Sequence, residues 1–185
     1  RLRQTGITAF EDYYRHLVRL PANAPEWDAF LQEITTHETY LFRDENQWDW
    51  LRKVYLPERA AAARAGHVPR SLRIWSAACS TGDEATTVAC CIAACPPEFE
   101  KWRISILGTD IGTGAIDEAR AAVFNDRAIR LVPSEYRDRY FTRVKDALLW
   151  RAKPMLTNLM VFRRHNLMEP LREPPFDLVF LKNVL

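Results

Sequence analysis

The sequence predicts an α/β fold, with a doubly wound parallel sheet preceded by a small all-helical domain. Two observations predict this class. From residue 71 onward, apolar runs of strand length alternate with helical segments, which is the pattern of a parallel sheet. Before residue 71, apolar residues recur at helical spacing in several short segments. A chain of 185 residues, 48% hydrophobic and 27% charged, is long enough for one sizeable domain with a helical appendage.

Short helices account for residues 1–66, which we predict to form the all-helical domain, with residues 67–72 as a linker. Apolar side chains fall at i, i+3, i+4 and i+7, for example from Trp27 to Ile34. Three helix starts are marked by residues that favour a first turn: the Thr8–Glu11 capping-box pair, Asn46 and Pro57.

Strands and helices alternate through residues 73–185, the predicted second domain. The expected strands are "LRIWSAA", "RISILGTD", "LMVFRRHN" and "FDLVFLKNV", and the helices are "EATTVACCIAA" and "TGAIDEARAAVF". Residues 133–158 are expected to be mixed, with a short helix near Tyr136 and a strand-like "LLW". Because the last apolar run reaches Leu185 and would leave a strand flank open, we expect this domain to be incomplete, with further strands beyond that residue.

Polar residues stand at the carboxyl end of each predicted strand. The first strand is followed by the loop "CSTGDE", and the others end at Asp110, Asn166 and Asn183. Ligands of doubly wound sheets bind at this edge. A carboxylate at the position of Asp110 can accept hydrogen bonds from both hydroxyls of a ribose; alternatively, it caps the helix that follows.

The loop after the first strand indicates which ligand to expect. It holds one glycine, Gly82, where a dinucleotide site requires G-x-G-x-x-G for the backbone to approach a pyrophosphate. Asp83 and Glu84 follow at the start of the helix, where they would repel phosphate. They suit a ligand with an ammonium group, such as the amino-acid end of S-adenosylmethionine. The alternative is that both carboxylates only offset the helix dipole.

Composition argues against several other classes of protein. The net charge is +2 and no segment concentrates basic residues, so we expect no nucleic-acid partner. No apolar run is long enough to cross a membrane, and the first residues lack the apolar stretch of a signal peptide, so we expect a cytoplasmic protein without membrane insertion. No metal site is expected, because the four cysteines do not have the spacing of metal-binding motifs. We expect them to be buried thiols: Cys79, Cys90, Cys91 and Cys95.

Five segments together resemble the chemotaxis receptor methyltransferases of the CheR type. They are "ITTHETYLFRD", "LRIWSAACSTGDEATTVA", "ILGTDIGTGAIDEARAAVF", "HNLMEP" and "FDLVFLKNVL". They occur in the family's order and at similar spacing, and cover nearly the whole chain. The resemblance implies an all-helical N-terminal domain followed by an S-adenosylmethionine-dependent methyltransferase domain.

The resemblance also implies roles for individual residues. In the family's T-T-N-E-T-x-F-F-R segment, three positions face the cofactor, and these match His37, Thr39 and Arg43. The remaining cofactor contacts would be Glu84 at the methionine portion, Asp110 at the ribose, Asn166 and Leu167 beside the adenine, and Asn183 and Val184. The sequence departs from the family's pattern at His37, where asparagine is usual, and at Lys182, where arginine is usual. A tyrosine near the transferred methyl falls beyond Leu185.

The activity implied by the resemblance is methyl transfer from S-adenosylmethionine to glutamate side chains of methyl-accepting chemotaxis receptors, in chemotaxis signalling. The product cofactor would be S-adenosylhomocysteine, and Arg43 would be the catalytic residue that positions a carboxylate. Two alternatives stay open: a methyltransferase of this fold with another substrate, and a non-catalytic regulatory module that binds the same cofactor. The glycine-poor loop disfavours a nicotinamide oxidoreductase.

Overall fold

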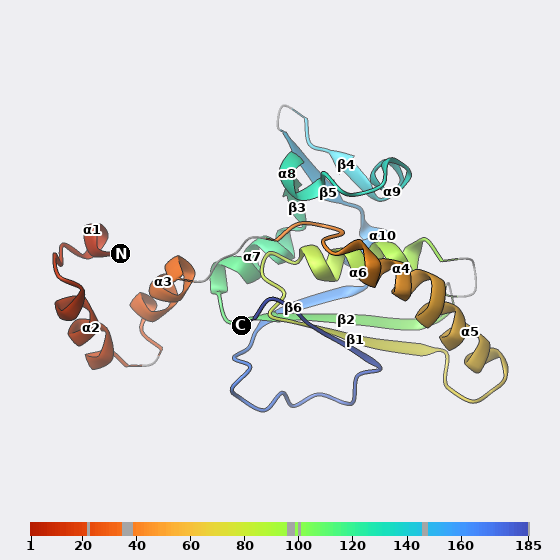
Figure 1. The fold of residues 1–185 in the computed structure, drawn as a ribbon, viewed down its shortest axis with the longest axis horizontal. Helices are drawn as coiled ribbons and strands as arrows, with labels where there is room; N and C mark the ends of the chain where they lie inside the picture. Colours follow the sequence, from red (N-terminus) through yellow and green to blue (C-terminus); the bar gives the residue numbers. More distant parts are fainter. Residues whose placement is uncertain (22, 35–38, 96–98, 100, 146–147, 185) are drawn as a thin grey trace.

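Four parallel strands form the central sheet of the computed structural model, which describes the chain except residues 22, 35–38, 96–98, 100, 146–147 and 185 (Figure 1). The strands are β1 (Ser71–Ala77), β2 (Arg103–Asp110), β6 (Met160–Arg164) and β7 (Leu178–Leu181), in the order β6-β2-β1-β7. The four segments predicted as strands all belong to this sheet, and the α/β fold class is confirmed.

The strand order places a ligand crevice at the end of β1. The chain proceeds outward from β1 to β2 and β6, and then returns to β7 on the other side of β1. β1 pairs in parallel with β2 from Ser71↔Arg103 to Ala77↔Thr109, and with β7 from Ile74↔Leu178 to Ala77↔Leu181. Sheets of this kind bind ligands where the strand order reverses, outside the carboxyl ends.

Helices pack on the sheet and enclose the core. The long helix α6 (Asp83–Ala93) follows β1 directly, and α7 (Thr113–Ala121) follows β2; the short α10 (Pro154–Thr157) lies beside α6. Fully buried apolar side chains join these layers into one cluster, among them Leu72, Ile74, Val88, Ile106, Ile116 and Leu156. Cys79, Cys90 and Cys91 are buried thiols without a disulfide, as predicted, whereas Cys95, also a free thiol, is only partly buried.

The helical residues before β1 occupy two places. α1 (Leu2–Thr5), α2 (Phe10–Arg19) and α3 (Pro25–Ile34) lie apart from the sheet in Figure 1. The continuous run of α4 (Glu45–Trp50), the π-helical turn η1 (Leu51–Tyr55) and α5 (Leu56–Arg64) instead shares the sheet's core through Trp48, Leu51 and Leu56. The division of the chain into domains 1–66 and 73–185 stays a prediction.

Two of the predicted helix starts are wrong. α2 begins at Phe10 with Ala9 at its N-cap and no side-chain cap, so Thr8 and Glu11 form no capping box. Asn46 lies inside α4, whose N-cap is Asp44 at φ 62°. Pro57 does lie in the first turn of α5, but this turn continues η1 without a break, so the proline marks no separate helix start.

A second, antiparallel sheet stands above the first in Figure 1. Its strands are β3 (Val123–Asn125), β5 (Leu149–Ala152) and β4 (Phe141–Arg143), in the order β3-β5-β4, with α8 (Asp126–Ile129) and α9 (Ser134–Tyr140) beside them. We call residues 123–152 the antiparallel module. The sequence predicts α9 and β5 but extends α7 through Phe124. The helix ends earlier because Ala122 is left-handed at φ 48°, and the next residues pair with β5.

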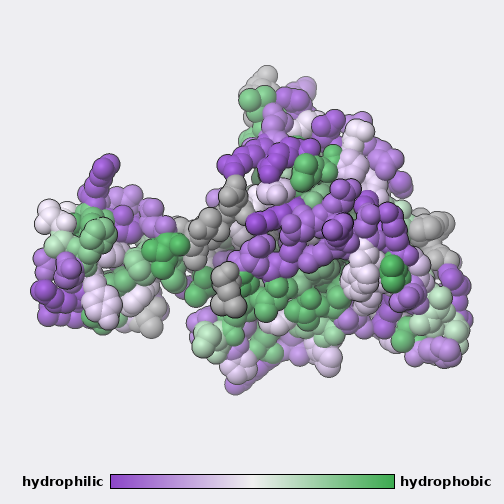
Figure 2. Space-filling view, viewed as in Figure 1, coloured by the Kyte–Doolittle hydropathy of each residue, from purple (hydrophilic) through white to green (hydrophobic). Residues whose placement is uncertain are grey.

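The hydropathy of the surface varies over the molecule. In the face shown in Figure 2, hydrophilic side chains predominate over α4 and the antiparallel module, and hydrophobic side chains gather below them. None of the helices in the described part of the chain is long and apolar enough to cross a membrane.

Candidate functional site

A cavity of about 680 Å³ opens at the carboxyl ends of the parallel strands. This volume lies within the range of about 300–1,000 Å³ that is typical of small-molecule sites. The cavity brings together most of the predicted site residues: Thr39, Arg43, Glu84, Asp110, Asn166, Leu167, Asn183 and Val184. His37 lies outside the described residues. The same walls contain residues that were not predicted as contacts, including Tyr40, Trp48, His165, Met168 and Lys182.

The loop between β1 and α6 has left-handed residues at alternate positions. Ala78 has φ 56°, Ser80 has φ 49° and Gly82 has φ 85°. The glycine is required at its position because a Cβ there would lie 2.9 Å from the Cβ of Ala119 on α7. The lone glycine therefore serves the close approach of loop and helix, while Ala78 and Ser80 line the cavity.

Asp110 is oriented by two backbone amides. It is the last residue of β2 and is 8% exposed; one carboxylate oxygen accepts a hydrogen bond from the Ser80 N–H at 2.8 Å, and the other from the Gly112 N–H at 2.9 Å. The N-cap of α7 is Gly112, so Asp110 is not the N-cap residue that the alternative interpretation required. An ionised carboxylate has about four acceptor sites, so these bonds leave capacity for two hydroxyl donors.

Asp83 and Glu84 lie in different surroundings, although they are adjacent. Glu84 lines the cavity and accepts a hydrogen bond from the Ser76 hydroxyl at 2.7 Å; burial raises the pKa of its carboxyl. Asp83 is 1% exposed, accepts a hydrogen bond from the Thr81 hydroxyl, and does not line the cavity. Burial raises the pKa of Asp83 to about 6. Successive residues on a helix point about 100° apart, so only one of the two predicted carboxylates faces the ligand site.

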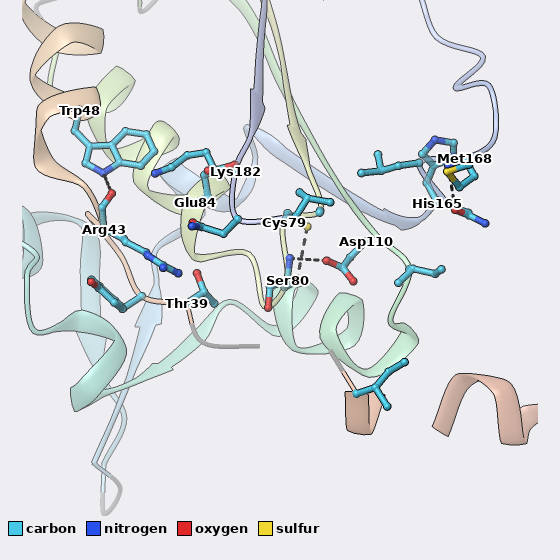
Figure 3. A pocket seen from close by; sticks show the side chains of 18 residues that line it. Thr39, Arg43, Trp48, Cys79, Ser80, Glu84, Asp110, His165, Met168 and Lys182 are labelled. Atoms are coloured by element: carbon cyan, nitrogen blue, oxygen red, sulfur yellow. Dashed lines mark hydrogen bonds between the residues drawn. The ribbon is translucent and has the colours of Figure 1, made fainter. Parts of the chain in front are cut away.

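The segment 39–44, which we call the strap, crosses the cavity opposite Asp110 (Figure 3). Its residues Phe42 and Asp44 are left-handed, at φ 59° and 62°, on either side of Arg43. The Phe42 N–H donates to the hydroxyl of Thr87 on α6 at 3.0 Å, and the indole N–H of Trp48 donates to the Arg43 carbonyl at 2.6 Å. These bonds hold the backbone in a conformation that directs Arg43 into the cavity.

Lys182, at the end of β7, connects the strap to the sheet. Its ammonium lies 2.8 Å from the Asp44 carboxylate and 5.5 Å from the ring centre of Trp48. The hydrogen bond from Lys182 lowers the pKa of Asp44, and the same positive charge opposes the rise in the pKa of Glu84. The position where arginine is usual in the family pattern thus carries a cation that pairs with the strap.

The far wall of the cavity is less polar. Asn166 follows β6, and its side-chain oxygen accepts a hydrogen bond from the Met168 N–H at 3.0 Å. Leu167 and Met168 are exposed there, and the His165 ring lies 6.3 Å from that of Trp75. An amide beside apolar side chains is suited to a flat heterocycle, because the ring faces need apolar contact and the ring edge needs hydrogen bonds.

Comparisons with known proteins identify the family of the chain. The family described as "CheR methyltransferase, SAM binding domain" matches residues 37–185. The chain belongs to this family. Among curated relatives, a probable chemotaxis protein methyltransferase of Rhizobium etli is 30% identical over the whole chain and 68% of its own length. The chemotaxis protein methyltransferases of Borreliella burgdorferi and Salmonella typhimurium are 28% and 31% identical over the whole chain, which covers 65% and 62% of their lengths. The chain thus spans about two thirds of the length of these relatives.

The CheR-family cofactor, S-adenosylmethionine, is compatible with the residues of the cavity. Asp110 has acceptor sites left for ribose hydroxyls, and Glu84 offers a partly buried carboxylate to an ammonium group. The apolar wall at Leu167 and Met168 can accommodate an adenine. Tyr40 was not singled out by the sequence, and Lys182 was noted only as a departure from the family's pattern, because their contacts come from segments distant in sequence.

Proposed function

We propose that the protein transfers a methyl group from S-adenosylmethionine to glutamate side-chain carboxylates of methyl-accepting chemotaxis receptors. Membership of the CheR methyltransferase family supports this proposal, as do the relatives named chemotaxis protein methyltransferases. The observation that carries it is the placement of Asp110, Glu84 and Arg43 around one cavity at the switch point of the sheet. The cytoplasmic part of the receptor would be the partner, and the protein would act in the cytoplasm.

Each of these residues has a separate task in the proposed reaction. When bound, the cofactor supplies an electrophilic methyl group on a sulfonium, and S-adenosylhomocysteine is left after transfer. Asp110 accepts the ribose hydroxyls and Glu84 holds the ammonium group. The cofactor-binding surface is completed by Thr39, Arg43, Asn166, Leu167, Asn183 and Val184, with His37 as a further predicted contact. Together they fix the donor relative to the strap.

Arg43 would bind the acceptor carboxylate. A glutamate side chain has an ordinary pKa near 4.3 and is ionised at neutral pH, so its oxygen can attack without a general base. The remaining requirement is alignment of the two reactants, which bidentate guanidinium–carboxylate hydrogen bonds provide. Arg43 extends into the cavity from the strap, opposite Asp110, where it can hold an acceptor beside the donor (Figure 3).

The test is methyl incorporation into receptor-containing membranes by the full-length protein, with S-adenosylmethionine labelled in its methyl group. Base-labile label in the receptor, absent with Arg43→Ala, is the expected result, because a carboxyl methyl ester releases methanol in alkali. Base-stable label would point to another acceptor. No label, with cofactor binding intact, would favour the non-catalytic regulatory module.

A further inference from the structure

Tyr40 in the strap is contacted by two guanidinium groups. The Cζ of Arg130 lies 3.7 Å from the ring centre, and that of Arg43 lies 5.7 Å from the same centre. Arg130 belongs to the antiparallel module and follows α8 directly. At 3.7 Å a planar guanidinium is in stacking contact with the ring face, an arrangement that lysine cannot reproduce.

The antiparallel module also holds the backbone beside Tyr40. The Leu41 N–H donates to the carbonyl of Ala128, at 3.0 Å. Arg130 is itself oriented, because its guanidinium donates to the carbonyl of Arg127 at 2.7 Å. The module therefore contacts the strap at two adjacent residues, through the backbone of Leu41 and the ring of Tyr40.

The two residues that contact the module come directly before the part of the strap with left-handed backbone conformations. Arg43 is flanked by the left-handed residues Phe42 and Asp44, and such conformations persist only where the surroundings hold them. Thr87 and Lys182 hold these two residues from the side of the parallel sheet. Arg130 and Ala128 hold the preceding two from the antiparallel module, so the position of Arg43 depends on both sheets.

We infer that Arg130 is a positioning residue for Arg43, acting through the ring of Tyr40. The antiparallel module thereby sets where the Arg43 guanidinium stands in the cavity. The inference rests on the proposed function only for the role of Arg43 in the reaction; the coupling between the two arginines can be measured without catalysis.

The test is a double-mutant cycle with Arg130→Gln and Arg43→Gln, using two readouts. The first is the Nε–Hε resonance of Arg43 in the protein without ligand, assigned by its loss in Arg43→Gln. The second is the dissociation constant of S-adenosylhomocysteine. Arg130→Gln is expected to shift the resonance and to weaken binding about twofold to fivefold, the equivalent of an exposed cation–π contact. Tyr40→Leu should have the same effects. Arg130→Lys keeps the positive charge but cannot stack on the ring, so this variant should lie between wild type and Arg130→Gln in both readouts.

Non-additivity distinguishes positioning from general loss of structure. In the Arg43→Gln background, Arg130→Gln should no longer change the dissociation constant. An equal effect in both backgrounds would overturn the inference, as would an unchanged Arg43 resonance. Arg143→Gln is the matched control, because Arg143 is also an exposed arginine over an aromatic ring of the module, 5.3 Å from the centre of Trp150, and does not line the cavity. If the wild-type protein does not bind S-adenosylhomocysteine, the proposed function fails, and the resonance alone decides this inference.

Discussion

Removal of the Asp110 carboxylate is predicted to weaken the binding of S-adenosylhomocysteine at least tenfold. The carboxylate is held by the amides of Ser80 and Gly112 and faces the cavity with acceptor sites to spare. A hydrogen bond to a charged group contributes about 1.5–3 kcal/mol. Loss of one ribose hydroxyl contact at the lower end of this range corresponds to about tenfold in affinity, and loss of both to more than a hundredfold.

The same substitution also affects the fold. In Asp110→Ala the buried Gly112 amide and the partly buried Ser80 amide lose their acceptor, and an unsatisfied buried group costs about 1–3 kcal/mol. We therefore expect a lower melting temperature together with the weaker binding. In Asp110→Asn one oxygen is kept, so this variant should fall between alanine and wild type in both measurements.

Isothermal titration calorimetry, performed well below the melting temperature of each variant, measures the effect. Asp117→Ala is the matched control, because Asp117 is an exposed aspartate on α7 that does not line the cavity. If folded Asp110→Ala bound S-adenosylhomocysteine within twofold of wild type, Asp110 would not hold the ribose and the proposed orientation of the cofactor would be wrong.

Three further predictions concern neighbouring residues. Glu84→Gln should weaken cofactor binding about tenfold, because a buried ammonium loses its counter-charge. Burial raises the pKa of Glu84, so on acidification this carboxylate should lose its charge at a higher pH than an ordinary glutamate does. The affinity of the wild-type protein for the cofactor should fall over the same pH range. The same pH profile in Glu84→Gln would contradict this. Asp83 binds a proton more readily in the folded chain, with a pKa of about 6, than in the unfolded one. The free energy of unfolding should therefore decrease as pH rises from about 4 to about 6, by as much as about 3 kcal/mol. Urea titrations at several pH values should show that the free energy of unfolding depends less on pH in Asp83→Asn. An unchanged pH dependence would mean that another group causes it. Gly108→Ala should destabilise by about 1–3 kcal/mol, because its Cβ would overlap the ring of Phe162; an unchanged urea midpoint would show that the ring can move aside.

The parallel sheet is predictable from the sequence because its signals are local. Alternating burial in β1, with Leu72 and Ile74 inward, and the apolar run of β2 are visible in consecutive residues. The short strands β3 and β4 were missed because three residues carry no measurable periodicity. β3 forms only by pairing with β5, which lies distant in the sequence, whereas β4 directly precedes β5 and pairs with it as the next strand along the chain.

In the candidate site, too, only the residues with a local sequence signal were predictable. Asp110, Asn166 and Asn183 were found because they follow strands, and parallel strands end at one edge. The difference between Asp83 and Glu84 was not predictable, because the direction of the helix on the sheet decides which carboxylate is buried. The contacts of Tyr40 and Lys182 were not predictable, since their partners Arg130 and Asp44 are brought to them only by the fold.

A crystal structure of the chain with S-adenosylhomocysteine is the most direct test of the central claim, that this cavity holds the methyl donor. We predict that both ribose hydroxyls donate to the Asp110 carboxylate, with the amino group at Glu84 and the adenine between Asn166 and Leu167. A nucleoside bound elsewhere, or in this cavity with its ribose turned away from Asp110, would contradict the account.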